Sequence, residues 1–396
     1  MHLSGWKKSM KSLFRINAGH NRIFGLDILR ALAILFVVFG HSAILVPEQY
    51  KSFIRIVTLD GVAIFFVLSG FLIGGILLKI LEKEKPTFKN LLIFWSRRWL
   101  RTLPVYIVIL TFVIVFTYIY KPERLPSDWY KYYIFIQNFN QAIPNFFKES
   151  WSLSIEEWFY LLVPTSLFIL LNLFKKSVKA TSLVLIIGGI IAIVWYRFHL
   201  YESIPAPSRL DKDAFSQYLH NVGEIITYQV IPRLDAIMFG VLGAFVAQYY
   251  PKTWKKASLL LIPLLALPLM YILKYYISHR HDEYSFVMLP VIKSFVVFCT
   301  LPYFSNLKSG PKIFSKPITF ISLISYSMYL TNLTIVIHIF IKFGLHNNIR
   351  GLHKCGETWE WEYIYFWFVT ISLSYLLYVL VEQPFMRLRD LKKNKK

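Results

Sequence analysis

Ten long apolar runs limit what this chain can fold into more than any other feature of its sequence. A helix needs about 20 apolar residues to cross the hydrocarbon core of a bilayer, and each run reaches or approaches that length. Only 17% of the residues are charged, against about 25% in soluble domains. The sequence therefore predicts an all-α, polytopic membrane helix bundle with about ten transmembrane helices. The approximate bounds of the runs are 28–46, 61–80, 103–119, 154–172, 181–197, 233–250, 257–278, 286–304, 318–341 and 362–382.

The positive charge is distributed unevenly between the connections that join these runs. The chain has a formal net charge of +22. With the first segment placed in the cytosol, the cytosolic connections hold 27 Lys and Arg residues, and the opposite connections, of similar total length, hold 11. This asymmetry is the positive-inside pattern, with both termini cytosolic. Since no basic helix or aromatic platform accompanies the charge, we expect a lipid bilayer and no nucleic acid as a partner.

The chain is predicted to hold one membrane domain, at 24–389. A basic cytosolic segment, 1–23, precedes it, and a basic cytosolic tail, 390–396, follows it. The two cysteines, Cys299 and Cys355, are too few for a disulfide framework or a structural zinc site. We therefore expect no metal.

Two polar side chains, Arg30 and His41, interrupt the first apolar run. Charged groups inside spans are costly and usually face the bundle interior or a water-filled cavity. Arg30 lies about one turn inside the cytosolic end, where snorkelling and pairing with Asp27 at i−3 are the structural alternative. His41 lies roughly 7 Å below the outer end, at 1.5 Å per residue. A buried, hydrogen-bonded structural histidine is the alternative to a functional one.

The stretch WSLSIEEWFYLLVP brings two adjacent carboxylates into the outer leaflet. Adjacent residues point about 100° apart on a helix, so both side chains cannot face lipid cheaply. Ser154 and Glu157 fit the S-x-x-E capping box. This leaves Glu156, with Tyr160 one turn below on the same face, as the predicted partner of His41. A carboxylate beside an imidazole fixes its tautomer and raises its basicity, which suits a general base.

Three arginines enter the third run from the cytosolic side in the stretch SRRWLRTLP. Arg97 and Arg101 stand at i and i+4, on one helix face, and Arg98 lies between them. One interpretation is topology determination with binding of anionic headgroups. The other is a phosphate clamp, because guanidinium forks match phosphate oxygens.

The stretch PRLDAIMFG opens the sixth run from the outer side. Arg233 and Asp235 could pair with each other or bind a polar acceptor, and Asp235 could also favour the dipole of the helix start. Lys293 and His338 also lie inside spans, and the sequence suggests no partner for either.

Together these elements resemble acyltransferase family 3 of integral membrane acyltransferases, from about Phe24 to Arg389. The most specific element is R-x10-H, formed by Arg30 and His41 in LDILRALAILFVVFGH. It is followed in order by GVAIFFVLSGFLI, SRRWLRTLP, WSLSIEEWFY, PRLDAIMFG, SYSMYL and EQP. The sequence departs from the family after SYSMYL, where it has Thr331-Asn332 and relatives often carry a histidine. No chemistry is predicted there.

The resemblance implies transfer of an acyl group, most often acetyl, from cytosolic acyl-CoA to a hydroxyl of an envelope sugar, glycan or glycolipid. The expected place is the outer side of a bacterial cytoplasmic membrane. The implied catalytic residues are His41, Glu156 and Glu157. The implied donor-binding residues are Arg30, Arg97, Arg98 and Arg101. The residues proposed for the acceptor are Arg233, Asp235 and Tyr160.

The resemblance leaves two mechanisms open, direct attack by the acceptor hydroxyl and a covalent acyl-histidine relay. The eleven residues from Arg30 to His41 span about 16 Å of helix, similar to the reach of a phosphopantetheine arm. The alternative function is a membrane transporter or a flippase-like component for an envelope glycan precursor, because polar intramembrane residues also suit a substrate pathway. A transporter should show paired halves with broken helices, and the sequence shows no such symmetry.

Overall fold

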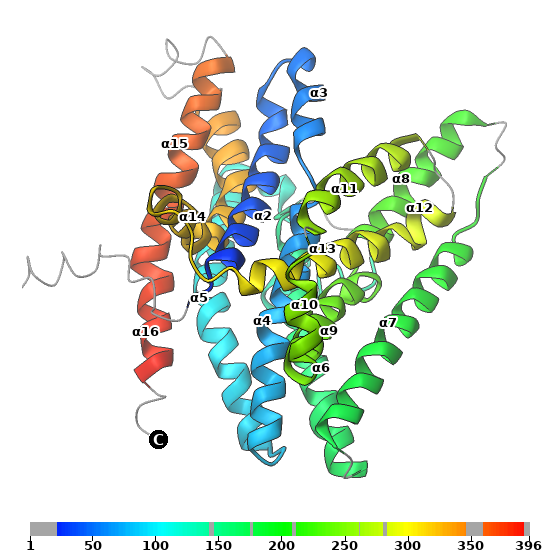
Figure 1. Cartoon of the computed structure of the whole chain (residues 1–396). Coiled ribbons are helices and arrows are strands. Elements are labelled where there is room, and N and C mark those ends of the chain that lie inside the picture. Colours follow the sequence, from blue (N-terminus) through cyan, green and yellow to red (C-terminus); the bar gives the residue numbers. More distant parts are fainter. Residues whose placement is uncertain are drawn as a thin grey trace, which may run out of the picture. The chain divides into compact units, whose positions relative to one another are not determined.

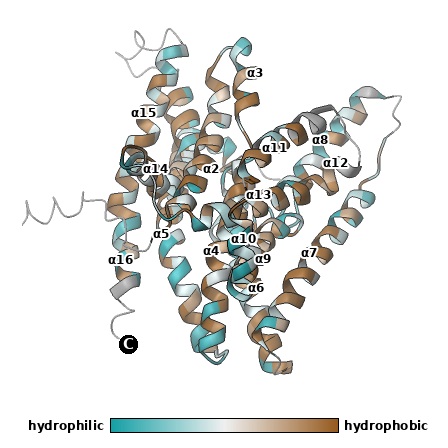
Figure 2. Ribbon diagram, viewed as in Figure 1, coloured by the Kyte–Doolittle hydropathy of each residue, from teal (hydrophilic) through white to brown (hydrophobic). Residues whose placement is uncertain are grey.

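The computed structural model describes residues 22–141, 146–174, 177–207, 211–260, 262–279, 283–345 and 359–391 (Figure 1). Over these residues the regular structure is helical, without a β-strand. The predicted cytosolic segment and tail fall almost wholly outside the described residues. Figure 2 shows apolar residues along the long helices, as expected for helices that face lipid.

Eight helices among the described residues are long and apolar enough to cross a membrane. A ninth is counted if Pro251–Ala257 and Ile262–Leu273, which meet at a 61° bend, form one span. Helix α13 (Leu289–Asn306), which carries Lys293 and two prolines, is not among them. The predicted all-α polytopic bundle is confirmed, with eight or nine candidate spans where the sequence predicts about ten.

The chain divides into two compact units. The first comprises residues 1–58, 96–121 and 307–396. Its helices are α2 (Phe24–Ser42), α3 (Glu48–Val57), α5 (Phe88–Tyr120) from Ser96 onward, α14 (Lys312–Thr331), α15 (Trp359–Leu377) and α16 (Gln383–Leu391). Helix α2 packs chiefly on α14. Buried Leu29, Ile34 and Val38 of α2 and Ile324 and Met328 of α14 belong to its core.

Two segments of the first unit are π-helical, Asn332–Leu345 after α14 and Tyr378–Glu382 between α15 and α16. Regular α-helix is the default for apolar runs of this kind, and π-helical turns are rare and frequent at functional sites. One segment begins at Asn332 and the other ends at Glu382, two polar residues inside apolar stretches.

The second unit comprises residues 59–95 and 122–306. After α4 (Gly61–Lys83) and the first turns of α5, it contains a 3₁₀ helix at Trp129–Ile134. The long helices that follow are α6 (Ser150–Phe174), α7 (Val178–Ser203), α8 (Lys212–Tyr228) and α9 (Leu234–Tyr249). Its last helices are α10 (Pro251–Ala257), α11 (Ile262–His279), α12 (Glu283–Val287) and α13.

The core of this unit is the close crossing of α4 and α9. A Cβ placed on Gly70 would lie 1.9 Å from the carbonyl oxygen of Ile237, and one on Gly240 would lie 2.0 Å from that of Val67. Only glycine fits such a backbone approach, which is the usual role of small residues between membrane helices. The crossing holds together the starts of both helices, where several polar side chains lie.

Candidate active site

His41, in the last turn of α2, forms a hydrogen bond with Asn332 within the first unit. The distance from His41 Nδ1 to Asn332 Oδ1 is 2.6 Å. The amide nitrogen of Asn332 donates to the backbone carbonyls of Met328, at 2.8 Å, and Tyr329, at 2.9 Å. Because both carbonyls can only accept, the amide oxygen of Asn332 faces the imidazole and accepts a hydrogen bond from it. Nδ1 therefore carries the hydrogen, and Nε2 keeps its lone pair.

Asn332 holds this orientation because of its place in the chain. It is fully buried and is the first residue of the π-helical segment, directly after Thr331 ends α14. Thr331 itself bonds the Ser327 carbonyl at 2.9 Å and the Ser374 hydroxyl at 3.1 Å. That no chemistry lies at Asn332 stays a prediction, but the structure shows that its amide contacts His41. The departure from the family motif was the available signal, since an amide can orient an imidazole as a second imidazole can.

Asp27, near the start of α2, is surrounded by donors from three places in the first unit. Arg22 Nε lies 2.9 Å from Asp27 Oδ2, and Ser322 Oγ of α14 donates to Asp27 Oδ1 at 2.8 Å. Arg30 Nη1 lies 3.6 Å from the same Oδ1. The predicted i−3 pairing of Arg30 with Asp27 is confirmed. Ser322 also accepts from Arg22 at 2.9 Å and from Arg30 at 3.4 Å, which joins α2 to α14.

Glu382, which sequence reasoning left outside the site, belongs to the same charged region. It is 3% exposed and accepts a hydrogen bond from Ser327 Oγ at 3.4 Å. Its carboxylate interacts electrostatically with Arg101, Arg30 and Arg22. The EQP motif, with a carboxylate inside the last span, was the signal that could have found it.

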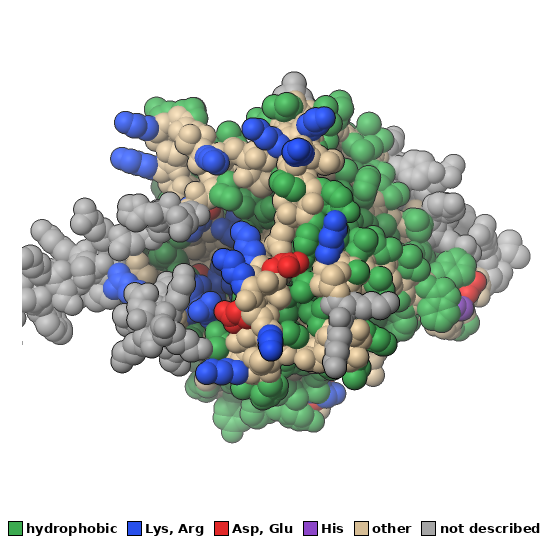
Figure 3. Space-filling model, turned by 60° about the horizontal axis from the view of Figure 1, so that its bottom comes forward, with side chains coloured by type: hydrophobic (Ala, Val, Ile, Leu, Met, Phe, Trp, Pro, Cys, Tyr) green, Lys and Arg blue, Asp and Glu red, His purple; other side chains and the backbone are tan. Residues whose placement is uncertain are grey.

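The first unit therefore gathers more arginine than carboxylate. Arg22, Arg30 and Arg101 act on Glu382, and among the residues that the structure describes Asp27 adds the second negative charge of the group. Arg97 and Arg98 stand one turn before Arg101 on α5. Lys and Arg side chains also gather on the face shown in Figure 3. An excess of partly buried guanidinium groups suits a polyanionic ligand such as a phosphate-bearing cofactor.

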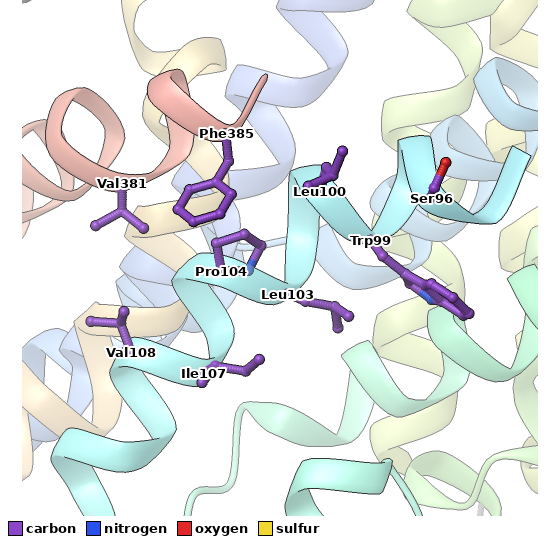
Figure 4. A pocket seen from close by; sticks show the side chains of 9 residues that line it. All are labelled: Ser96, Trp99, Leu100, Leu103, Pro104, Ile107, Val108, Val381 and Phe385. Carbon is purple, nitrogen blue, oxygen red and sulfur yellow. The ribbon is translucent and has the colours of Figure 1, made fainter. Parts of the chain in front are cut away.

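An apolar groove runs along α5 in the same region. Its volume is about 540 Å³. In Figure 4, Phe385 points toward Pro104 inside α5, with Val381 beside them and Trp99 at the far end. The arginines of SRRWLRTLP thus share their helix with an apolar surface, and polar and apolar parts of one ligand could be held together there.

In the second unit, Glu156 joins a small hydrogen-bonded group. Tyr160 Oη donates to the Glu156 carboxylate one turn away. Ser69 of α4 lies 2.6 Å from Tyr160 Oη and donates to Glu156 Oε2 at 3.3 Å. The predicted shared face of Glu156 and Tyr160 is confirmed, and Ser69 is an addition that the sequence did not suggest.

The capping-box interpretation of Ser154 and Glu157 is wrong. Helix α6 begins at Ser150, so Ser154 lies inside the helix and cannot cap its start. Its hydroxyl accepts from Gln137 Nε2 at 2.7 Å instead. Glu157 is 8% exposed and therefore needs another explanation than closing the helix start.

Asp235 is held by an arginine that the sequence did not single out. Arg197 Nη2 of α7 lies 2.7 Å from Asp235 Oδ2, and both side chains are fully buried. Arg197 also donates to the carbonyls of Pro232, at 3.0 Å, and Val287, at 2.7 Å. The only sequence signal was a charge at the end of an apolar run. The acceptor-binding role of Asp235 stays a prediction, beside this evident structural role.

Lys293, for which the sequence offered no partner, pairs with Asp60. Its Nζ lies 3.3 Å from Asp60 Oδ2, and Asp60 Oδ1 caps α4 by accepting from the Ala63 amide at 3.0 Å. Arg233 lies over the ring of Phe66, 5.9 Å from its centroid. These side chains, with Asp235, place charge where α4 and α9 begin.

The predicted site residues fall into two sets. His41 and the arginines at 30, 97, 98 and 101 belong to the first unit, whereas the carboxylates at 156 and 157, Tyr160, Arg233 and Asp235 belong to the second. The predicted meeting of His41 with Glu156 joins residues of different units and stays a prediction. What the structure provides for His41 is the amide of Asn332.

Comparison with known proteins adds independent findings. A family model described as "Acyltransferase domain" matches residues 23–381. The chain is 30% identical over 299 residues to peptidoglycan O-acetyltransferase OatA of Listeria monocytogenes, covering 66% of this chain and 45% of that protein. It is 35% identical over 166 residues to O-acetyltransferase OatA of Staphylococcus aureus, covering 38% and 26%.

A putative O-acetyltransferase of S. aureus is 25% identical over 390 residues, covering 92% of this chain and 57% of that protein. The chain thus spans between about a quarter and three fifths of the length of these relatives. No solved structure matches it significantly.

Proposed function

The chain belongs to the acyltransferase family whose model covers residues 23–381, and on that premise we propose that it acetylates a hydroxyl of a cell-envelope glycan. The names of its relatives support acetyl as the group and peptidoglycan as the acceptor class. The proposed donor is acetyl-CoA from the cytosol, and the proposed location is the bacterial cytoplasmic membrane.

The observation that carries this proposal is the hydrogen bond between His41 and Asn332. A general base must present a lone pair to the proton that it removes. The anchored amide of Asn332 holds the proton on Nδ1, so Nε2 is the free basic nitrogen. A purely structural histidine could form the same hydrogen bond, and loss of transfer in His41→Ala without loss of folding separates the two roles.

The excess of arginine supports an anionic donor. Arg22, Arg30 and Arg101 would bind phosphate oxygens of CoA, with Asp27 and Glu382 holding the guanidinium groups in place. Arg97 and Arg98 would extend this surface. The length of α2 from Arg30 to His41, about 16 Å at 1.5 Å per residue, is close to the reach of the phosphopantetheine arm that carries the thioester.

The proposed reaction is direct transfer. His41 Nε2 takes the proton of the acceptor hydroxyl while the hydroxyl oxygen attacks the thioester carbonyl carbon. The carbon–sulfur bond then breaks, and CoA leaves as a thiolate that takes the proton back from the imidazolium. The products are an acetyl ester and CoA thiol, and His41 returns to its starting state.

The test uses the purified full chain in lipid nanodiscs with acetyl-CoA and peptidoglycan oligosaccharides. Release of CoA thiol and formation of acetyl ester, measured by mass spectrometry, are expected for the wild type and are lost in His41→Ala. Wild-type transfer by His41→Ala would reject the base. An acetylated His41 peptide, trapped by rapid quenching, would replace direct transfer with the relay.

The donor side is tested with membrane vesicles. Acetyl-CoA does not cross the bilayer, so inside-out vesicles should use added acetyl-CoA and right-side-out vesicles should not. The opposite result would place the donor on the outer side. Movement of glycan without any acetyl ester would favour the alternative, a transporter or flippase-like component.

A further inference from the structure

Arg233, at the start of α9, has a buried guanidinium group. Its Nε lacks a hydrogen-bond partner among the described residues. The residue is 4% exposed. Its close neighbour is the ring of Phe66, with the guanidinium carbon 5.9 Å from the centroid. An aromatic face attracts a cation but accepts no conventional hydrogen bond. A buried donor of a charged group that lacks a hydrogen-bond partner is costly, so the position of this Nε needs a reason.

The neighbouring charges do not neutralise Arg233. Asp60 and Asp235 act on it electrostatically, but both are already engaged. Asp60 pairs with Lys293 and caps α4, and Asp235 pairs with Arg197 at 2.7 Å. The two pairs cancel internally. Among the described residues of this group, the positive charge of Arg233 is left over.

Aromatic rings and an amide side chain form a series of contacts that begins at Phe66, the ring beside Arg233. Phe66 meets Trp151 edge to face, with centroids 5.9 Å apart, and Trp151 meets Tyr228 at 5.0 Å. Asn138 donates to the Tyr228 carbonyl at 2.6 Å and to the Trp151 carbonyl at 3.1 Å. Its fully buried Oδ1 has no partner among the described residues. Rings with a few unsatisfied polar groups are typical of small-molecule sites, and a sugar offers both apolar C–H faces and hydroxyl donors.

We propose that Arg233 binds a carboxylate of the acceptor, which makes the acceptor an acidic glycan. The guanidinium fork matches two carboxylate oxygens, and a bound carboxylate would neutralise the unpaired charge. The sugar that bears it would lie near Phe66, Trp151 and Tyr228, with a hydroxyl donating to Asn138. This inference rests on the proposed function and names the substrate class of the same enzyme.

Binding without any acyl donor provides the test. The probes are an alternating N-acetylglucosamine–N-acetylmuramic acid tetrasaccharide with free lactyl carboxylates, and the neutral N-acetylglucosamine tetrasaccharide of the same length. The wild-type chain in nanodiscs should bind the carboxylated probe at least tenfold more tightly. Arg233→Gln should remove this preference by weakening only the carboxylated probe, about tenfold. Arg233→Lys, which keeps the charge but not the fork, should be intermediate.

Arg124→Gln is the matched control, because Arg124 is an exposed arginine of the same unit. It should leave both affinities unchanged. Equal wild-type affinity for the two probes, or an equal loss for both in Arg233→Gln, would overturn the proposal. The wild-type comparison stands even if Arg233→Gln does not fold. Tighter binding of the neutral tetrasaccharide carrying a reducing-end phosphate would assign the site to phosphate instead.

This test separates the inference from the proposed function. Because no acetyl-CoA is present, failure of acetyl transfer does not affect the binding result. Conversely, efficient acetylation of the neutral tetrasaccharide without any preference for the carboxylated one would support the proposed acetyltransferase activity. The same result would reject the proposed binding of an acidic acceptor by Arg233.

Discussion

Arg197 and Asp235 form an ion pair of 2.7 Å in which neither side chain is exposed to solvent. Removing one partner of such a pair leaves an uncompensated buried charge, which costs about 3–5 kcal/mol. We expect Asp235→Asn to lower the thermal unfolding midpoint of the protein in nanodiscs markedly. Arg197→Met combined with Asp235→Leu should recover much of the loss. A stable Asp235→Asn variant that has lost transfer would instead favour the predicted contact with the acceptor.

Replacing Asn332 should lower kcat and leave the KM for acetyl-CoA almost unchanged. Asn332→Leu keeps the approximate size of the side chain and removes the acceptor for His41 Nδ1–H. General base catalysis contributes on the order of 10²–10⁴ in rate, so we expect kcat to fall about 100-fold while the KM for acetyl-CoA changes less than twofold. Asn332→Asp, which keeps an acceptor oxygen, should retain more activity than Asn332→Leu. Equal loss in both variants would argue against orientation of the imidazole.

The α4–α9 crossing should not tolerate a methyl group. Gly70→Ala places a Cβ against the Ile237 carbonyl, and overpacking of this kind costs about 1–3 kcal/mol or more. We expect a lower unfolding midpoint and a lower yield of folded protein. Gly188→Ala in α7 is the matched control, since its Cβ would meet nothing within 4 Å. It should be neutral or stabilise by up to about 1 kcal/mol. Similar behaviour of the two variants would mean that the crossing is not tightly packed.

Arg101 should contribute to donor binding. Arg101→Gln removes one guanidinium of the group that surrounds Glu382. A hydrogen bond to a charged group is worth about 1.5–3 kcal/mol, so the KM for acetyl-CoA should rise at least tenfold while the KM for the glycan stays constant. Lys121→Gln removes one charge beyond the other end of α5 and serves as the control. A parallel rise in both KM values would reject a specific role for Arg101 in donor binding.

The contribution of Glu156 to catalysis can be tested through the hydroxyl group that bonds it. Tyr160→Phe removes the hydroxyl that bonds Glu156 and Ser69. If Glu156 supports catalysis, Glu156→Gln and Tyr160→Phe should lower kcat in the same direction, and the double variant should lose less than the sum of the two. Additive losses, measured in the same transfer assay, would show that the two groups act independently.

Sequence reasoning succeeded where the interaction lies within one helix. The pairing of Arg30 with Asp27 and the shared face of Glu156 and Tyr160 follow from i+3 and i+4 spacing, and both are present. Apolar run length correctly predicts the membrane bundle. Within the described residues eight or nine helices are candidate spans; the ninth depends on a pair of helices bent by 61°, and α13, with Lys293 and two prolines, is not counted.

The interactions that were missed join helices far apart in the sequence. His41 with Asn332, Arg197 with Asp235 and Lys293 with Asp60 depend on how helices pack, and no local spacing predicts that. The capping box failed for a related reason. A motif of four residues cannot show that its helix already begins at Ser150.

The π-helical segment that begins at Asn332 changes how variants beyond it should be chosen. A π turn holds more residues than an α turn, since its hydrogen bonds run from i to i+5. Over the 14 residues from Asn332 to Leu345, a helical wheel drawn at 100° per residue drifts steadily away from the true faces. A mutational scan interpreted with that wheel would assign lipid-facing tolerance to positions that point inward, and an alignment gap of one residue here would rotate every later position by roughly a quarter of a turn.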